Sequence, residues 1–317
     1  MKLTVEKALT HWGVEGARYE LVAARENSVF RVDANGRTMA LRLHRPGYRS
    51  DAELRSELIW MQEVSDGGIA VPSPIPSTDG NFLHHVDGIQ VDALTWLGGD
   101  TLTASMNGSE GPRRRLLFQT LGQDMARLHS ICDSWSCPPD FDRAKWDIDG
   151  LLGENPLWGR FWENPHLSSS DQLLFQSFRD EAAIELISND GRLDFGLIHA
   201  DLVPDNVLVS GNKLKMIDFD DGGFGYRLFD VATSLLKFSR EDDFWLLREA
   251  LVEGYASVRD LDVEKLDLFL AIRAMTYVGW NISRMDEAGA LERNERFIST
   301  AREMSQNYLS RKSSNKQ

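Results

Sequence analysis

The stretch Leu197-Ile-His-Ala-Asp-Leu-Val-Pro-Asp-Asn206 decides the fold of this chain, together with the acidic run Asp218-Phe-Asp-Asp221 that follows it. Between them, residues 207–217 form two short apolar runs around a Ser-Gly-Asn-Lys loop, a pattern typical of a β-hairpin. Because a hairpin returns the chain to its starting end, we expect Asn206 and Asp218 to lie close together.

The residue types in these two segments suit phosphoryl transfer. A loop carboxylate such as Asp201 can orient a substrate hydroxyl, and Asn206 and Asp218 offer the hard oxygen ligands that Mg²⁺ prefers. Any one of these residues alone is equally well explained as a turn or capping residue. The ordered set of histidine, aspartate, asparagine, hairpin and aspartate favours the functional interpretation.

The two segments resemble those of a known superfamily, the aminoglycoside phosphotransferases and choline kinases. Residues 199–206 resemble its catalytic loop, H-G-D-x-x-x-x-N, with Ala200 in place of the common glycine, and residues 217–220 resemble its metal-binding segment. The resemblance implies that Asp201 is the catalytic base and that Asn206 and Asp218 bind Mg²⁺. It also implies ATP as co-substrate, with GTP as the alternative.

The resemblance further implies an α+β, bilobal, protein-kinase-like fold. We expect a nucleotide-binding lobe over residues 1–96, with a small antiparallel sheet and one helix, and a mostly helical lobe over residues 97–317 with the catalytic loop, metal and acceptor site. Alternating runs between residues 20 and 45, with the turn signal Asn35-Gly36, predict an antiparallel meander. A further hairpin is expected over residues 81–96. Apolar spacing predicts helices near residues 51–64, 113–130, 242–256 and 262–284.

Arg42 lies where the superfamily and its protein-kinase relatives place the phosphate-anchoring lysine of the third strand. Glu57, on the apolar face of the following helix, is its expected ion-pair partner, and Glu53 is the second candidate. A purely structural arginine is the alternative. Residues 25–28 occupy the position of the loop that covers the ATP phosphates in the superfamily, but they include no glycine.

The strand that ends the second hairpin is expected to bind the adenine ring. By resemblance the contacts come from the backbone of Ala93, Leu94, Thr95 and Trp96, because a strand edge presents free N–H and C=O groups to a flat purine. An ordinary connecting strand is the alternative, and the two interpretations are compatible.

Three other features have a structural and a functional interpretation. Asp230 resembles the superfamily's buried aspartate that supports the catalytic loop, with a helix N-cap as the alternative. His129 ends a helix and is expected to be a core or capping residue rather than a catalyst. The tryptophans and carboxylates of residues 133–168 either hold a cationic acceptor or pack in the core.

Composition excludes several classes of protein. The 317 residues are 42% hydrophobic, and no apolar run approaches the length of a membrane span. No signal-peptide core is present at the beginning, so a cytoplasmic location is expected. A net charge of −14 argues against a nucleic-acid partner. The two cysteines are expected to be reduced, and the oligomeric state is open.

These observations predict a phosphotransferase that acts on a hydroxyl of a small molecule, such as an amino alcohol or an aminoglycoside. Two alternatives stay open. One is a Ser/Thr protein kinase like the bacterial stress-response members of the superfamily. The other is a nucleotide-binding pseudokinase, which is suggested by Arg42 and the glycine-free loop.

Overall fold

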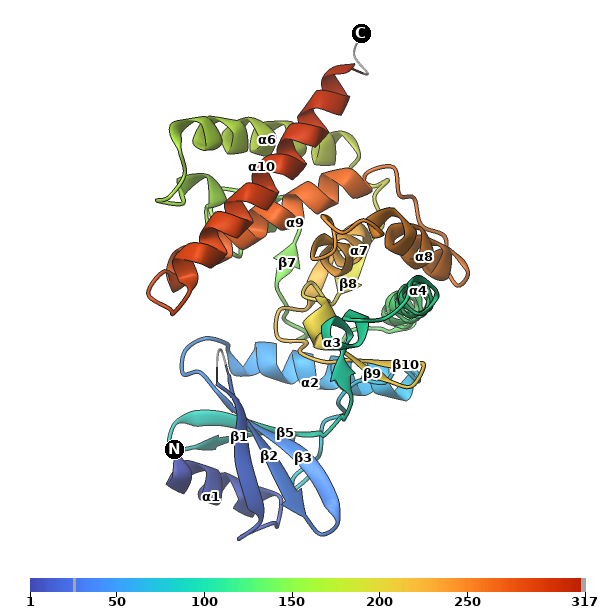
Figure 1. The fold of residues 1–317 in the computed structure, drawn as a ribbon. Coiled ribbons are helices and arrows are strands. Elements are labelled where there is room, and N and C mark those ends of the chain that lie inside the picture. The colour runs from blue at the N-terminus through green and yellow to red at the C-terminus, as the bar shows by residue number, and fades with distance from the viewer. Residues whose placement is uncertain (25–26, 315–317) are drawn as a thin grey trace. The chain divides into compact units, whose positions relative to one another are not determined.

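The computed structural model describes residues 1–24 and 27–314 (Figure 1). The chain divides into two compact units, each described here by itself. Unit 1 comprises residues 1–107, 130–143 and 205–220, and unit 2 comprises residues 108–129, 144–204 and 221–317. The division differs from the expected single boundary after residue 96: unit 1 continues to residue 107, and two later segments of the chain also belong to it.

Unit 1 is built on a five-stranded antiparallel sheet with the strand order β1-β2-β3-β5-β4 (Figure 1). The predicted meander is confirmed. At its turn, Asn35 and Gly36 have φ values of 52° and 72°, which is the left-handed pair that a tight hairpin requires. The strands are β1 (Arg18–Ala24), β2 (Asn27–Ala34), β3 (Arg37–His44), β4 (Leu83–Val86) and β5 (Ile89–Thr95).

The two faces of this sheet bury different kinds of side chain. On one face, Leu41 and Val91 pack with Trp12 and with Leu9 of helix α1 (Lys2–His11), an element that the sequence analysis did not predict. Because side chains alternate along a strand, the neighbours of these apolar residues point to the other face, where helix α2 (Asp51–Asp66) lies. The predicted helix at residues 51–64 is therefore confirmed.

The predicted hairpin at residues 207–217 is also present in unit 1. Strand β9 (Val207–Ser210) pairs with β10 (Lys213–Met216) and with the short strand β6 (Asp100–Thr101), which precedes helix α3 (Leu102–Met106). The chain at Gly99 has φ +150°, and a Cβ atom there would lie 2.8 Å from the carbonyl oxygen of Val209. Only glycine permits this close approach.

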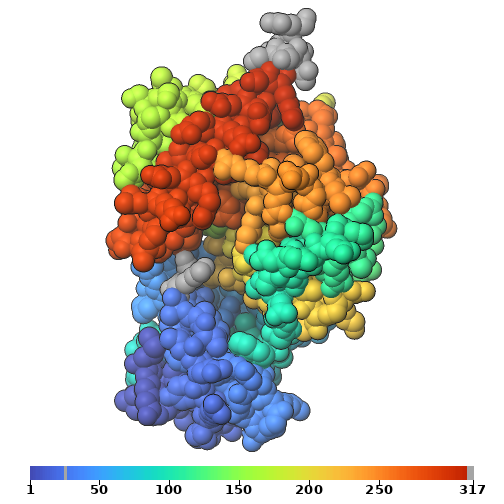
Figure 2. All heavy atoms as spheres, in the orientation of Figure 1, coloured from blue at the N-terminus to red at the C-terminus, as the bar shows by residue number. Residues whose placement is uncertain are grey.

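Unit 2 is mostly helical. Helix α9 runs through its interior, and α10 packs along both α9 and α6, with much of its length visible at the surface (Figures 1 and 2). A small sheet has the order β7-β11-β8. Its strands are β7 (Lys145–Trp146), β8 (Phe195–Ile198) and β11 (Gly223–Tyr226). The α-helices of unit 2 are α5 (Ile148–Leu152), α6 (Ser169–Ser188), α7 (Arg227–Leu236), α8 (Phe244–Ala256), α9 (Leu266–Trp280) and α10 (Ala290–Ser314). Its 3-10 turns are η1 (Phe161–Glu163) and η3 (Ile282–Arg284). Helix α4 (Gly111–Ser134) and the 3-10 turn η2 (Pro204–Asn206) each have residues in both units.

The helices α4, α8 and α9 correspond to predicted ones, whereas α6 and α10 were not predicted. Across residues 1–24 and 27–314, no helix combines the length and the apolar character that a membrane span requires.

Candidate active site

The loop that carries Asp201 is fixed through its backbone by Asp230. The carboxylate of Asp230, on α7, accepts hydrogen bonds from the N–H groups of His199 at 2.8 Å and Ala200 at 2.7 Å. The N-cap of α7 is Tyr226, so Asp230 supports the loop rather than capping the helix. Ala200 has φ +63°, a left-handed conformation that explains why glycine is common at this position.

A buried histidine contacts the carboxylate of Asp230. His129 Nε2 lies 3.1 Å from Asp230 Oδ2, and His129 Nδ1 lies 2.8 Å from the hydroxyl of Tyr255. Burial, assisted by the positive charge of Arg227, lowers the pKa of His129 to about 4. A neutral ring that donates from Nε2 and accepts at Nδ1 satisfies both contacts. The expectation that His129 is a core residue is therefore confirmed.

The charge on Asp230 is retained in this environment. Burial by itself raises the pKa of a carboxyl group, but the hydrogen bonds that Asp230 accepts from His129 and from the N–H of His199 outweigh it and lower the pKa of Asp230. The loop is therefore held by an ionised carboxylate.

The side chain of Asp201 has a partner that the sequence analysis missed. Arg273 Nη2, on α9, donates to Asp201 Oδ1 at 2.6 Å. The Arg273 side chain is fully buried, whereas 22% of the Asp201 side chain is exposed. The sequence signal was a single cation inside the apolar run of residues 268–275, since a buried charge needs a counter-charge.

The two proposed metal ligands lie at the same end of the β9–β10 hairpin, in unit 1. The N–H of Ile217 donates to the carbonyl of Asn206 at 2.9 Å, so the residues on either side of the hairpin are brought together. Asp218 is exposed and has φ +69°, an energetically costly conformation for an aspartate. One amide and one carboxylate oxygen donor fit the requirements of Mg²⁺.

Two arginines fix the segment that carries Asp218. Arg143 Nη2 donates to the carbonyls of Phe219 at 2.8 Å and Asp220 at 2.6 Å, and Arg49 Nη2 donates to the Asp220 carbonyl at 3.0 Å. The Asp220 side chain is buried and faces Arg49 Nε at 3.7 Å. The geometry therefore favours a structural role for Asp220 over a metal contact.

Arg42 forms the predicted ion pair with Glu57, Nη1 to Oε1 at 2.6 Å. It also forms two contacts with Asp92 of β5, Nε to Oδ1 and Nη2 to Oδ2, both at 2.8 Å. Glu53 instead accepts the N–H of Ser50 in a capping box, so the alternative pairing with Glu53 was wrong. All three guanidinium nitrogens of Arg42 are therefore already engaged with carboxylates.

The expected adenine-binding edge is partly occupied by the protein itself. The Ala93 carbonyl accepts the N–H of Ile75 at 2.8 Å, and the Thr95 N–H donates to the Ser73 carbonyl at 2.8 Å. The premise of a free edge was therefore wrong for Ala93 and Thr95, because residues 73–75 run beside β5. In the expected phosphate-covering loop, residues 25 and 26 lie outside the described residues.

Tryptophans of the irregular segment contribute to packing. Trp146 is buried and stacks on Phe229 with ring centroids 5.4 Å apart. Trp162 has the guanidinium of Arg179 over one ring face at 3.9 Å. These contacts favour the packing interpretation over a cage for a cationic acceptor.

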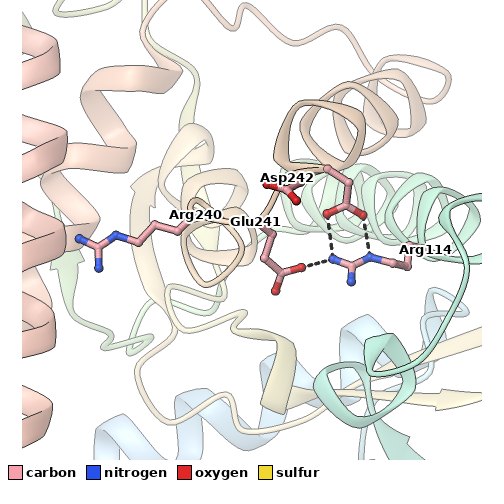
Figure 3. Close-up of a pocket in the computed structure, with 5 residues that line it drawn as sticks. Arg114, Arg240, Glu241 and Asp242 are labelled. Atoms are coloured by element: carbon pink, nitrogen blue, oxygen red, sulfur yellow. Dashed lines mark hydrogen bonds and ion pairs between the residues drawn. The ribbon is translucent and has the colours of Figure 1, made fainter.

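A charged depression of about 400 Å³ lies elsewhere in unit 2 (Figure 3). Arg114 is paired there with Glu241 and Asp243, and Arg240 points away from Arg114, toward Glu303 at 2.9 Å. Both arginines of the depression are paired with carboxylates, and none of its residues is a predicted site residue, so the proposed catalytic and metal-binding residues stay the same.

The sequence profile of the phosphotransferase enzyme family matches residues 19–268. The chain belongs to this family. A solved "microcompartment-associated aminopropanol kinase" has 28% sequence identity and a TM-score of 0.85, with 98% of each chain covered. Amicoumacin kinase of Bacillus subtilis (strain 168) is 25% identical over 72% of this chain and 66% of its own. Homoserine kinase of Rhizobium meliloti (strain 1021) is 27% identical over 76% of this chain and 70% of its own.

These matches confirm the resemblance, the protein-kinase-like α+β fold and the enzyme class. The chain is a phosphotransferase that acts on a hydroxyl group of a small molecule.

Proposed function

We propose that this phosphotransferase moves the γ-phosphoryl group of ATP to the hydroxyl of a small amino alcohol. The similarity to an aminopropanol kinase, which covers 98% of each chain, supports this acceptor class. Aminopropanol and homoserine share a primary amine and a hydroxyl, so the named substrates of two relatives have the same functional groups.

Asp201 is the proposed base. The observation that carries this assignment is its loop: the Asp230 carboxylate fixes the backbone at His199 and Ala200, while the Asp201 side chain keeps 22% of its surface exposed. As the acceptor oxygen forms its bond to the γ-phosphorus, the bond to the ADP oxygen breaks, and Asp201 accepts the hydroxyl proton. A fixed loop keeps the reorganisation cost of this step low.

Asn206 and Asp218 are the proposed ligands of the divalent ion, Mg²⁺. When bound, this ion neutralises charge on the nucleotide phosphates. The support is the pairing of the two residues at one end of a hairpin and the left-handed conformation of Asp218. Asp201 is five residues from Asn206, so chain length alone limits their separation to ~18 Å.

On the nucleotide side, we propose that Arg42 acts mainly by joining Glu57 and Asp92, since its nitrogens are already engaged. Adenine recognition is assigned to the end of the predicted segment, at Trp96, because Ala93 and Thr95 bond to residues 73–75 and Leu94 is paired with Ala40 of β3.

A coupled assay of ADP release tests the proposal. Purified protein is mixed with Mg·ATP, or with Mg·GTP, and a panel of amino alcohols, hydroxy amino acids, aminoglycosides and sugars. We expect turnover that depends on an amino alcohol and on the metal ion. Asp218→Asn should abolish turnover, whereas Asp205→Asn, at an exposed position beside Asn206, should not.

Other outcomes identify the alternatives. Phosphorylation of the chain itself or of a protein, without turnover of small alcohols, would contradict the proposal and favour a protein kinase. Binding of Mg·ATP without turnover of any acceptor would favour a pseudokinase.

A further inference from the structure

Arg273 is a fully buried cation with an unusual set of partners. Its Nη2 atom donates to Asp201 Oδ1 at 2.6 Å and to the hydroxyl of Tyr277 at 3.2 Å. Its Nε and Nη1 atoms are buried without a hydrogen-bond partner among the described residues. A buried guanidinium that leaves two nitrogens unused reduces stability compared with one that is fully paired.

The same chain shows what a fully paired buried arginine looks like. Arg42 engages two carboxylates through three nitrogens. Arg273 instead engages a single oxygen of Asp201, and that carboxylate remains partly exposed. The arrangement therefore directs the one strong contact of Arg273 at the residue proposed as the base.

Aromatic rings replace the missing hydrogen bonds. The guanidinium carbon of Arg273 lies 4.5 Å from the ring centroid of Trp158, 4.4 Å from that of Tyr277 and 5.3 Å from that of Phe229. Ring faces stabilise a cation by electrostatic attraction and do not compete with Asp201 as hydrogen-bond acceptors. The rings thus stabilise the buried guanidinium without competing for its contact with Asp201.

A close backbone contact holds Trp158 over Arg273. A Cβ atom on Gly279 of α9 would lie 2.6 Å from the carbonyl oxygen of Trp158, and Gly159 has φ +86°. Both positions therefore require glycine, and together they let the Trp158 segment lie directly on α9. This contact is independent of the ion pair.

We infer that Arg273 is a positioning residue for Asp201, held in place by Trp158, Tyr277 and Phe229; the inference rests on the proposed role of Asp201 as the base. Arg273 fixes one carboxylate oxygen of Asp201. Its positive charge also offsets the repulsion between that carboxylate and the phosphates of the nucleotide, an effect that is strong in a buried environment.

Steady-state kinetics of position 273 test the inference. Arg273→Met is expected to lower kcat by ~10²-fold, as for a misplaced catalytic group, while the KM for ATP changes little. Arg273→Lys keeps the charge but loses the planar fork, so an intermediate kcat is expected. The matched control is Arg179→Met, which removes a guanidinium from the face of Trp162 without touching Asp201.

Chemical rescue separates positioning from a purely structural role. In Arg273→Ala, guanidinium at concentrations well below its denaturing range should fill the space and raise kcat several-fold, whereas urea at the same concentration should not. Gly279→Ala, which keeps Arg273 but displaces Trp158, should lower kcat in the same direction. If Arg273→Met and Arg273→Ala do not fold, Arg273→Lys and Gly279→Ala, which both keep the cation, decide the question.

Two results would overturn the inference. One is a kcat of folded Arg273→Met equal to that of the parent. The other is a loss of activity in Arg273→Met and Arg273→Ala when Arg273→Lys is equally inactive and guanidinium does not raise the kcat of Arg273→Ala. Asp201→Asn separates this inference from the proposed role of Asp201: if Asp201→Asn is as active as the parent, the assignment of Asp201 as the base fails. If Asp201→Asn is inactive while Arg273→Met is fully active, only the inference about Arg273 fails.

Discussion

Arg42 and Asp92 are direct cross-strand neighbours on β3 and β5, and two nitrogens of the arginine each lie 2.8 Å from an oxygen of the aspartate. Together with Glu57 they form a buried ion-pair cluster, with 7% of the Arg42 side chain exposed and the two carboxylates fully buried. A single ammonium group cannot reproduce three separate contacts.

Arg42→Lys is therefore expected to lower the free energy of unfolding by about 2 to 3 kcal/mol, since one buried carboxylate loses part of its pairing. Urea denaturation measures the change. Arg31→Lys, on the neighbouring strand with 40% of its side chain exposed, is the control and should change stability by less than ~0.5 kcal/mol. A stability of Arg42→Lys equal to that of the parent would contradict the account of the cluster.

Asp230→Asn tests the support of the catalytic loop. The substituted amide presents one oxygen and one NH₂ group, so one of the N–H groups of His199 and Ala200 would face a donor instead of an acceptor. We expect a loss of about 2 kcal/mol in stability and a fall in kcat that exceeds any rise in the KM for ATP. Ser257→Ala, at the end of α8, is a control outside the loop and should leave kcat unchanged.

The buried imidazole of His129 predicts a pH dependence of stability. Its folded pKa of about 4 lies below the ordinary value near 6.5, so between these pH values the unfolded chain binds a proton that the folded chain does not. Stability is therefore fully present above pH ~6.5 and declines as the pH falls toward 4, by ~3 kcal/mol in total from this group.

Denaturation curves at several pH values measure this effect. His129→Gln should remove most of the decline between pH 6.5 and 4, whereas His166→Gln, at an exposed position, should retain it. If parent and His129→Gln lost stability in parallel over this range, the neutral buried histidine would be refuted.

The parts of the fold and site that could be predicted are those encoded by nearby residues. The β9–β10 hairpin has a turn between two apolar runs, and Arg42 and Glu57 lie 15 residues apart on consecutive elements. In both cases local periodicity or a short connection restricts the possible partners. Asp230 was recognised instead by its resemblance to the superfamily's buried aspartate.

The partners that could not be predicted are distant in sequence. Arg273 lies 72 residues from Asp201, and Asp92 lies 50 residues from Arg42. Helix α6 was missed because its apolar residues do not follow one buried face: Leu173, Ile184 and Ile187 are all exposed. Periodicity identifies a helix only when burial is confined to one side.

The role of Asp201 is tested most directly by measuring phosphoryl transfer from ATP to the best acceptor of the panel with the parent enzyme and with Asp201→Asn. Asparagine keeps the size of the side chain but cannot accept the hydroxyl proton. The account predicts that kcat falls by at least ~10²-fold while ATP still binds with similar affinity. A kcat for Asp201→Asn within a few-fold of the parent value would contradict the assignment of the base.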